Sequence, residues 1–201
     1  RLTDRSWREH DNEDALLAQW ETLTEAHDEP MLTLLYLTAA RYLIAPAEHT
    51  AALTRAKERY PEVVALWLLE LRLLEERSTP AQVLEAALVA AQAHPASGAI
   101  QLVRYEAMAE LGQYEDAERG LKSVLVQDGS LVGARMALAD LYLVTDREAE
   151  RMSAMMYVLS DTTAVSDQLR FLKHHASAMA NRGRLKDASK LWDFIYSRIF
   201  F

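Results

Sequence analysis

The 201-residue sequence contains no cysteine, only six glycines and only five prolines. The lack of cysteine excludes a disulfide framework, a thiolate metal site and a cysteine nucleophile. The scarcity of glycine and proline leaves long stretches rich in Ala, Leu, Glu and Arg, a composition with high helix propensity. Because half of the residues are hydrophobic, the chain can also bury a core. The sequence therefore predicts an all-α protein.

The sequence also has no hydrophobic run of the kind that crosses a bilayer. The longest stretch without Asp, Glu, Lys or Arg, residues 86–103, includes Gln92, His94 and Gln101. We therefore expect no direct insertion into a membrane. No targeting peptide is visible, but the sequence begins at Arg1 rather than Met, so we expect it to be part of a longer chain.

Positive charge is in short supply and is unevenly distributed. The formal net charge is −8, which argues against nucleic acid as a partner because neutralising phosphates requires an excess of Lys and Arg. Residues 169–201 carry seven Lys/Arg and two Asp/Glu, a net charge of +5, which leaves −13 for residues 1–168. This pattern has two interpretations: ordinary solvated helix faces, or a basic docking end.

Sequence signatures of catalysis and cofactor binding are missing. There is no Glu-x-x-His, His-Glu-x-x-His, glycine-rich phosphate loop or Gly-x-Ser-x-Gly elbow. The pair His174-His175 would diverge by about 100° on a helix, which suits a shared metal poorly. We expect one of these histidines to face a groove and the other to pack inside. The sequence thus predicts no cofactor, no metal and no enzyme; a helical enzyme, which would need acids or histidines clustered on one wall, remains an alternative.

Two segments share a helix-turn-helix pattern. Residues 109–117 and 180–188 each place Gly at a turn, an apolar or aromatic residue two positions on, and Asp-Ala after it. Pro61, Pro95 and Gly129 follow one another at intervals of 34 residues. A period of this length indicates helix pairs, and since an isolated pair cannot bury its apolar faces, the pairs are expected to stack.

This pattern resembles the tetratricopeptide repeat family, most clearly in residues 98–131. The residues at consensus-like points there are Met108, Gly112, Tyr114, Ala117, Val124 and Leu125. The resemblance implies a right-handed α-solenoid of antiparallel helix pairs, a single solenoid over residues 1–201. Its parts would be an N-terminal helix (1–29) and five repeats (30–63, 64–97, 98–131, 132–168 and 169–201). The turn at 145–147 is about two residues short in this alignment, which predicts a local irregularity.

In this family the first helix of each pair lines a concave groove that usually holds an extended peptide or a partner's helix. Carried over to this sequence, the groove positions are Thr38, Arg41, Arg72, Glu75, Glu106, Asp140, Arg170, Lys173, Ser177 and Asn181. The alternative is that these are merely exposed polar residues. A clamp for chaperone carboxylates is not expected, because Leu102, Glu106, Met136 and Asp140 occupy the places of its basic and amide residues.

The C-terminal stretch, residues 191–201, is apolar nearly all round, whereas the last helix of a solenoid needs a polar outer face. We expect Phe194, Ile199 and Phe200 to be covered by a further repeat or domain, a second copy of the chain, or a partner.

The sequence therefore predicts a non-enzymatic scaffold or adaptor that binds a protein partner in the groove or at the C-terminal end. The alternative is an accessory domain of a larger secretion, polysaccharide-export or transferase protein, docking a neighbouring enzyme. The composition resembles that of bacterial proteins; cytoplasm and periplasm both stay open, with envelope association slightly favoured.

Overall fold

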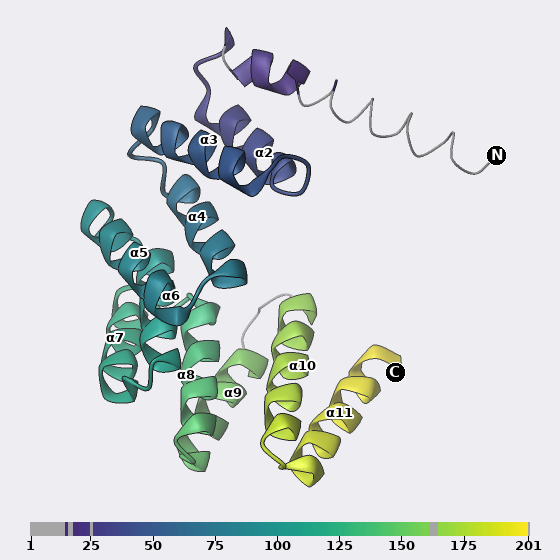
Figure 1. Ribbon diagram of the computed structural model, residues 1–201. Coiled ribbons are helices and arrows are strands. Elements are labelled where there is room, and N and C mark those ends of the chain that lie inside the picture. The colour runs from purple at the N-terminus through teal and green to yellow at the C-terminus, as the bar shows by residue number, and fades with distance from the viewer. Residues whose placement is uncertain (1–14, 16–17, 25, 161–164, 201) are drawn as a thin grey trace, which may run out of the picture. The chain divides into compact units, whose positions relative to one another are not determined.

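Proline and local capping set where several helices begin. The computed structural model describes residues 15, 18–24, 26–160 and 165–200, and leaves out the side chains of residues 159–160, 165–167, 170 and 198–200. In the described part every regular element is a helix (Figure 1). Pro30, Pro46 and Pro80 open three of the helices, where the missing N–H of proline costs nothing. The backbone N–H of Thr79 donates to Gln82 Oε1 at 3.0 Å, which completes a capping box.

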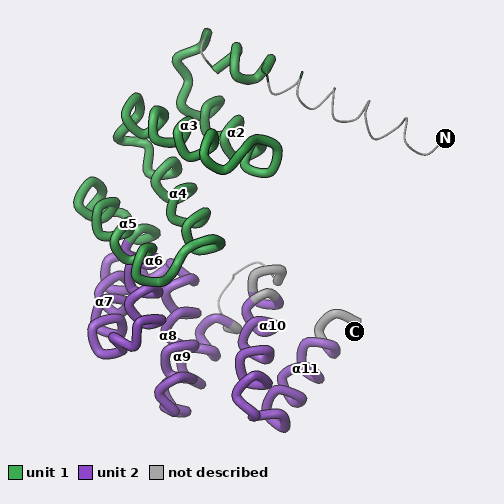
Figure 2. Tube along the Cα trace, viewed as in Figure 1, with its two compact units in different colours: residues 1–100 green, residues 101–201 purple. Residues whose placement is uncertain are grey.

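The chain divides into two compact units, residues 1–100 and 101–201 (Figure 2). The helices of the first unit, after a helical stretch at residues 18–24, are α2 (Pro30–Ala40), α3 (Pro46–Arg59), α4 (Val64–Arg77) and α5 (Pro80–Ala93). α6 (Gly98–Glu110) begins at the end of this unit. The second unit continues with α7 (Tyr114–Gln127), α8 (Val132–Val144), α9 (Glu148–Ser160), α10 (Val165–Asn181) and α11 (Leu185–Phe200).

In the first unit each helix packs against the next, and α2 also contacts α4. Its core is a cluster of buried aliphatic and aromatic side chains that includes Leu37, Leu53 and Leu66. His49 is also buried there, and its Nε2 lies 2.7 Å from the carbonyl oxygen of Leu37, which connects α3 to α2. α2 ends at Ala40 rather than continuing to Ile44 as the apolar pattern suggests, because Leu43 and Ile44 turn back to donate to the Ala40 carbonyl.

The second unit repeats this plan. α8 packs against α7, α9 and α10, and α10 packs against α11. Small residues lie in its core: Ala117, Ala139 and Ala176 are 0% exposed and Ala188 is 3% exposed. Stacking of consecutive helix pairs is the arrangement by which repeat proteins bury faces that no single pair could cover.

In the described part, three of the turns between the two helices of a pair contain one residue in the left-handed region. Gly112 has a φ of 78°, Gly183 has a φ of 76°, and Asp146 has a φ of 55°. The N–H of the next residue in each case, Gln113, Arg184 or Arg147, donates to the carbonyl of the residue five positions earlier in the chain. Asp146 thus takes the place of the turn glycine, 34 residues after Gly112. The expectation of a shortened turn at 145–147 is wrong, since Asp tolerates this conformation better than most residues.

Candidate functional site

Asp140 on α8 holds two histidines of α10. His175 Nδ1 lies 2.9 Å from Asp140 Oδ1, and His174 Nε2 lies 3.2 Å from Asp140 Oδ2. The two imidazoles differ sharply in environment, because His175 is 0% exposed and the His174 side chain is 65% exposed. One of the two histidines, His175, packs inside as expected, and His174 is exposed; that it faces a groove stays a prediction.

The hydrogen bonds of His175 define its protonation state. Its Nε2 lies 2.8 Å from Nη1 of Arg151, which is 3% exposed. A guanidinium can only donate, so Nε2 of His175 must accept, and the ring proton must sit on Nδ1 and be donated to Asp140. His175 is therefore neutral in this arrangement, and no Lys or Arg among the described side chains pairs with Asp140. Its Nδ1 carries a proton and is not available to ligate a metal.

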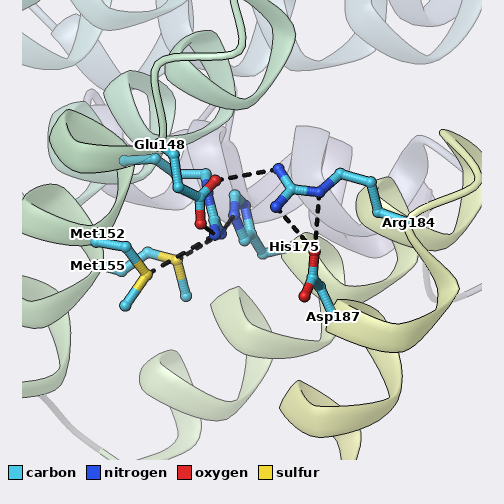
Figure 3. A network of polar contacts seen from close by, with 7 residues as sticks. Glu148, Met152, Met155, His175, Arg184 and Asp187 are labelled. Carbon is cyan, nitrogen blue, oxygen red and sulfur yellow. Dashed lines mark hydrogen bonds and ion pairs between the residues drawn. The ribbon is translucent and has the colours of Figure 1, made fainter.

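Arg151 anchors this arrangement from α9. It forms an ion pair with Glu148 on the same helix, donates from Nε to Glu148 Oε2 at 2.9 Å, and contacts Met155 Sδ at 3.1 Å (Figure 3). Glu148 in turn accepts from Arg184 Nη1 at 3.1 Å, and Arg184 pairs with Asp187 at 2.9 Å. The polar network thus joins α8, α9, α10 and α11, and every charge near the buried guanidinium has a partner.

The arginines also control the ionisation of Glu148. Hydrogen bonds from Arg151 outweigh burial and, with those from Arg184, lower the pKa of Glu148 to about 2. A carboxyl group with this pKa stays charged at neutral pH and is unsuited to general acid catalysis. The two arginines therefore hold Glu148 in its charged form and link α9 to the start of α11.

A second network connects α7, α8 and α9. Glu118 accepts from Lys122 at 2.7 Å and from Tyr142 at 3.1 Å, and it forms an ion pair with Arg147 at 2.5 Å. Burial raises the pKa of Glu118, but the hydrogen bonds from Arg147, Lys122 and Tyr142 outweigh it and lower the pKa to about 2. This cluster also ties successive helix pairs together.

The predicted groove residues of the second unit gather around α8 and α10. Lys173, Ser177 and Asn181 are exposed on α10, and the Asp140 side chain on α8 is 33% exposed. We call Asp140, Lys173, His174, Ser177 and Asn181 the α8–α10 surface. Glu106 is half-buried on α6, and the side chain of Arg170 lies outside the described residues.

The predicted groove residues of the first unit lie on α2 and α4, with Arg41 directly after α2. Thr38, Arg72 and Glu75 are exposed, whereas Arg41 is half-buried and pairs with Glu76 at 2.8 Å. The structure brings Arg41 to the end of α4 but engages it in an internal ion pair. This pairing leaves Arg41 less available to a partner than Arg72.

At the predicted C-terminal surface, Phe194 on α11 is 38% exposed. Leu185 (66% exposed) and Tyr196 (57% exposed) lie on the same helix. The side chains of Ile199 and Phe200 are outside the described residues. The described part of α11 therefore does present apolar side chains to solvent.

A hollow of about 280 Å³ lies in the first unit between residues 21–24, α2 and α3. Its floor includes Leu37 and Ala56, and Glu21, Arg55 and Arg59 line it. Arg59 is engaged by Asp28 at 2.9 Å. Among the residues that the structure describes, no three His, Asp or Glu side chains are grouped so as to hold a metal ion, and no helix is long and apolar enough to span a bilayer.

The buried part of the polar network was not predicted from the sequence. Arg151 and Glu148 looked like one more exposed pair on an acidic helix, because their spacing of three residues is common on solvated faces. The available signal was distance along the chain: Asp140 and His175 are 35 residues apart, and Glu148 and Arg184 are 36 apart, close to one repeat.

No protein-family model matches the sequence, and no curated protein resembles it detectably in sequence. A crystal structure described as that of a thermophilic tetratricopeptide repeat protein of Thermus thermophilus does match in three dimensions. The two share 21% sequence identity, with a TM-score of 0.62 over 83% of this chain and 90% of the other. The chain therefore has the tetratricopeptide repeat fold, with successive helix pairs consistent with about five repeats. Both the resemblance and the all-α fold class predicted from sequence are confirmed.

Proposed function

We propose that this chain is a non-enzymatic interaction scaffold that binds a segment of a partner protein along the α8–α10 surface. Tetratricopeptide repeats generally serve as protein–protein interaction scaffolds, which gives the class of function. The observation that carries the choice of surface is Asp140, a partly exposed carboxylate with fixed geometry on α8, beside the exposed residues Lys173, His174 and Ser177 of α10.

The absence of a catalytic arrangement in the described part supports a binding role. The carboxyl groups with strongly lowered pKa values, Glu118 and Glu148, are held by arginines and bridge helices. The buried histidine, His175, has both ring nitrogens engaged, Nδ1 with Asp140 and Nε2 with Arg151. Perturbed ionisation here follows from structural ion pairs rather than from a reaction site.

The proposal can be tested by selecting peptides from a displayed library of random twelve-residue sequences. The selected peptides are then measured against Lys173→Glu plus Ser177→Glu, two exposed changes on α10. We expect this variant to weaken binding at least about tenfold, equivalent to about 1.4 kcal/mol. The matched control is Ser123→Glu plus Val126→Glu on α7, where both residues are exposed and binding should change less than twofold.

Equal weakening by both double variants would reject the α8–α10 surface. Selection of no peptide above the background of a protein-free surface would reject the scaffold function for this chain. Circular dichroism at 222 nm on each variant shows whether the helices remain formed, so that unfolding is not taken for lost binding.

The apolar face of α11 is a second candidate contact surface. It is favoured by Leu185 and Tyr196, which are eleven residues apart, lie on the same side of the helix, and are 66% and 57% exposed. Exposed apolar side chains on one helix are typical of surfaces that pack against another protein or domain. Leu185→Ser plus Tyr196→Ser should lower any concentration-dependent mass increase in light scattering; an unchanged mass would exclude this face from self-association.

A further inference from the structure

We propose that Asp140 is the subsite that receives a cationic side chain, Arg or Lys, of the bound segment. This inference rests on the proposed function and specifies the chemistry of its partner. It follows from three properties of the Asp140 carboxylate: no Lys or Arg among the described side chains pairs with it, its position is fixed from behind, and the described partner of its outer oxygen is an exposed histidine.

The first property is charge. In the described part of the chain, Asp140 forms ion-pair contacts with His174 and His175 but with no Lys or Arg. His175 is neutral because its Nε2 must accept from Arg151. Lys173 is exposed on the neighbouring helix but lies beyond ion-pair distance from Asp140. Glu118 and Asp187, two other half-buried carboxylates of this unit, each pair with an arginine, so Asp140 differs from them.

The second property is rigidity. Asp140 Oδ1 accepts from a fully buried imidazole, which is held by a guanidinium that is 3% exposed and is itself held by Glu148. The ring of Phe171 lies 5.5 Å from that of His175 and limits its rotation. A carboxylate fixed in this way loses little conformational freedom when a ligand binds, and such preorganisation favours affinity.

The third property is access. Asp140 Oδ2 is met at 3.2 Å by Nε2 of His174, whose side chain is 65% exposed. An exposed imidazole can swing into solvent at little cost, whereas an ammonium or guanidinium at the same oxygen would add the attraction between two full opposite charges to the hydrogen bond. His174 therefore occupies the subsite in the free protein and is displaced by the partner's cation.

The test uses the peptides selected on the whole chain. We expect a basic residue at one position of their shared pattern. Replacing that Arg by citrulline, or that Lys by norleucine, removes the charge without altering the protein and should weaken binding about five- to tenfold. Asp140→Asn should weaken the parent peptide by a similar factor and should not weaken the uncharged peptide further. The amide oxygen of Asn can still accept from His175, so the fold should be preserved.

His174→Ala is the sharpest variant because its expected effect has the opposite sign. Removing the competing imidazole should strengthen binding of the basic peptide about two- to threefold. A merely structural His174 would give weaker binding or no change.

Several outcomes would overturn this inference while leaving the scaffold function intact. They are selected peptides without a shared basic residue, equal binding of the charged and uncharged peptides, and weaker binding by His174→Ala. If no peptide is selected at all, both the scaffold function and the subsite are rejected.

Discussion

The ring of Tyr105 on α6 fills the space that a side chain at Gly120 on α7 would occupy. A Cβ atom at Gly120 would lie 2.1 Å from Cε1 and 2.3 Å from Cζ of Tyr105. Gly120 is in the middle of a helix, where glycine is unfavourable by about 1 kcal/mol relative to alanine. A glycine is found at this position because the ring of Tyr105 occupies the space that any side chain there would need.

Gly120→Ala should therefore destabilise the protein. The gain in helix propensity, about 1 kcal/mol, is smaller than the cost of forcing Tyr105 out of place, and we expect a net loss of about 1–2 kcal/mol in the free energy of unfolding. Urea denaturation followed by circular dichroism measures this change.

Two further variants test the cause. Gly129→Ala, at a position where the nearest atom would be a backbone oxygen at 3.6 Å, should change stability by less than about 0.5 kcal/mol. Tyr105→Leu should recover part of the loss when combined with Gly120→Ala, since the two residues are in contact. Strict additivity of the two changes would contradict a steric conflict between them.

The turn residues Gly112 and Asp146 make an independent prediction. Gly112 has a φ of 78° and no atom within 4 Å of a Cβ placed there, so Gly112→Ala should cost about 1–2 kcal/mol through backbone conformation alone. Asp146, with a φ of 55°, already carries a side chain in this conformation, and Asp146→Gly should raise stability by up to about 1 kcal/mol. Thermal unfolding of both variants would reveal the opposite signs, and changes of the same sign would contradict this account.

Replacing the buried Arg151 should lower the stability of the protein, because neighbouring polar groups depend on its guanidinium. Arg151→Met leaves His175 Nε2 without its donor and leaves Glu148 with Arg184 alone, and we expect a loss of about 3 kcal/mol. Adding His175→Phe removes the unsatisfied imidazole, so the double variant should be more stable than the sum of the single variants indicates. A double-mutant cycle in urea with a coupling energy near zero would show that the contact does not contribute.

Low pH should reduce the stability of the second unit, because Glu118 becomes protonated. Its pKa is lowered from 4.5 to about 2 in the folded protein, so its contribution to stability is present above pH 4.5 and is lost as the pH falls toward 2. In that window the unfolded state binds about one proton more than the folded state at this site. Glu118→Gln should accordingly lower stability near neutral pH and reduce the slope of the unfolding free energy against pH by up to about one proton, about 1.4 kcal/mol per pH unit.

Urea denaturation at several values between pH 2 and pH 6 provides that slope. Glu110→Gln is the matched control, because Glu110 is exposed on α6. If both variants keep the slope of the parent protein, Glu118 is not the group that responds to acid.

Much of the fold could be predicted from residue pattern alone because the determinants are local. Gly112 and Gly183 mark turns that glycine favours, Pro46 and Pro80 mark helix starts, and the alanines at 117, 139, 176 and 188 mark close helix contacts. Asp146 was misjudged because its left-handed backbone, stabilised by the bond from Arg147 N–H to the Tyr142 carbonyl, is indistinguishable in sequence from an ordinary acidic loop residue.

The candidate site depended on contacts that local pattern does not contain. Asp140, Lys173, Ser177 and Asn181 were predicted as groove residues from their place in the repeat, and whether they bind a partner stays a prediction. The burial of Arg151 and His175, and the resulting neutral imidazole, arise only when α8, α9 and α10 come together.

The amino-acid sequence by itself determined the helices, their turns and the repeating plan, since helix propensity and side-chain periodicity act over a few residues. Tertiary structure alone decided which carboxylates pair with an arginine and which contact only histidine among the described residues. Glu118 and Glu148 meet arginines from other helices, while Asp140 meets a neutral histidine. Electrostatic compensation depends on distances between helices 24–36 residues apart in the chain, and packing sets those distances.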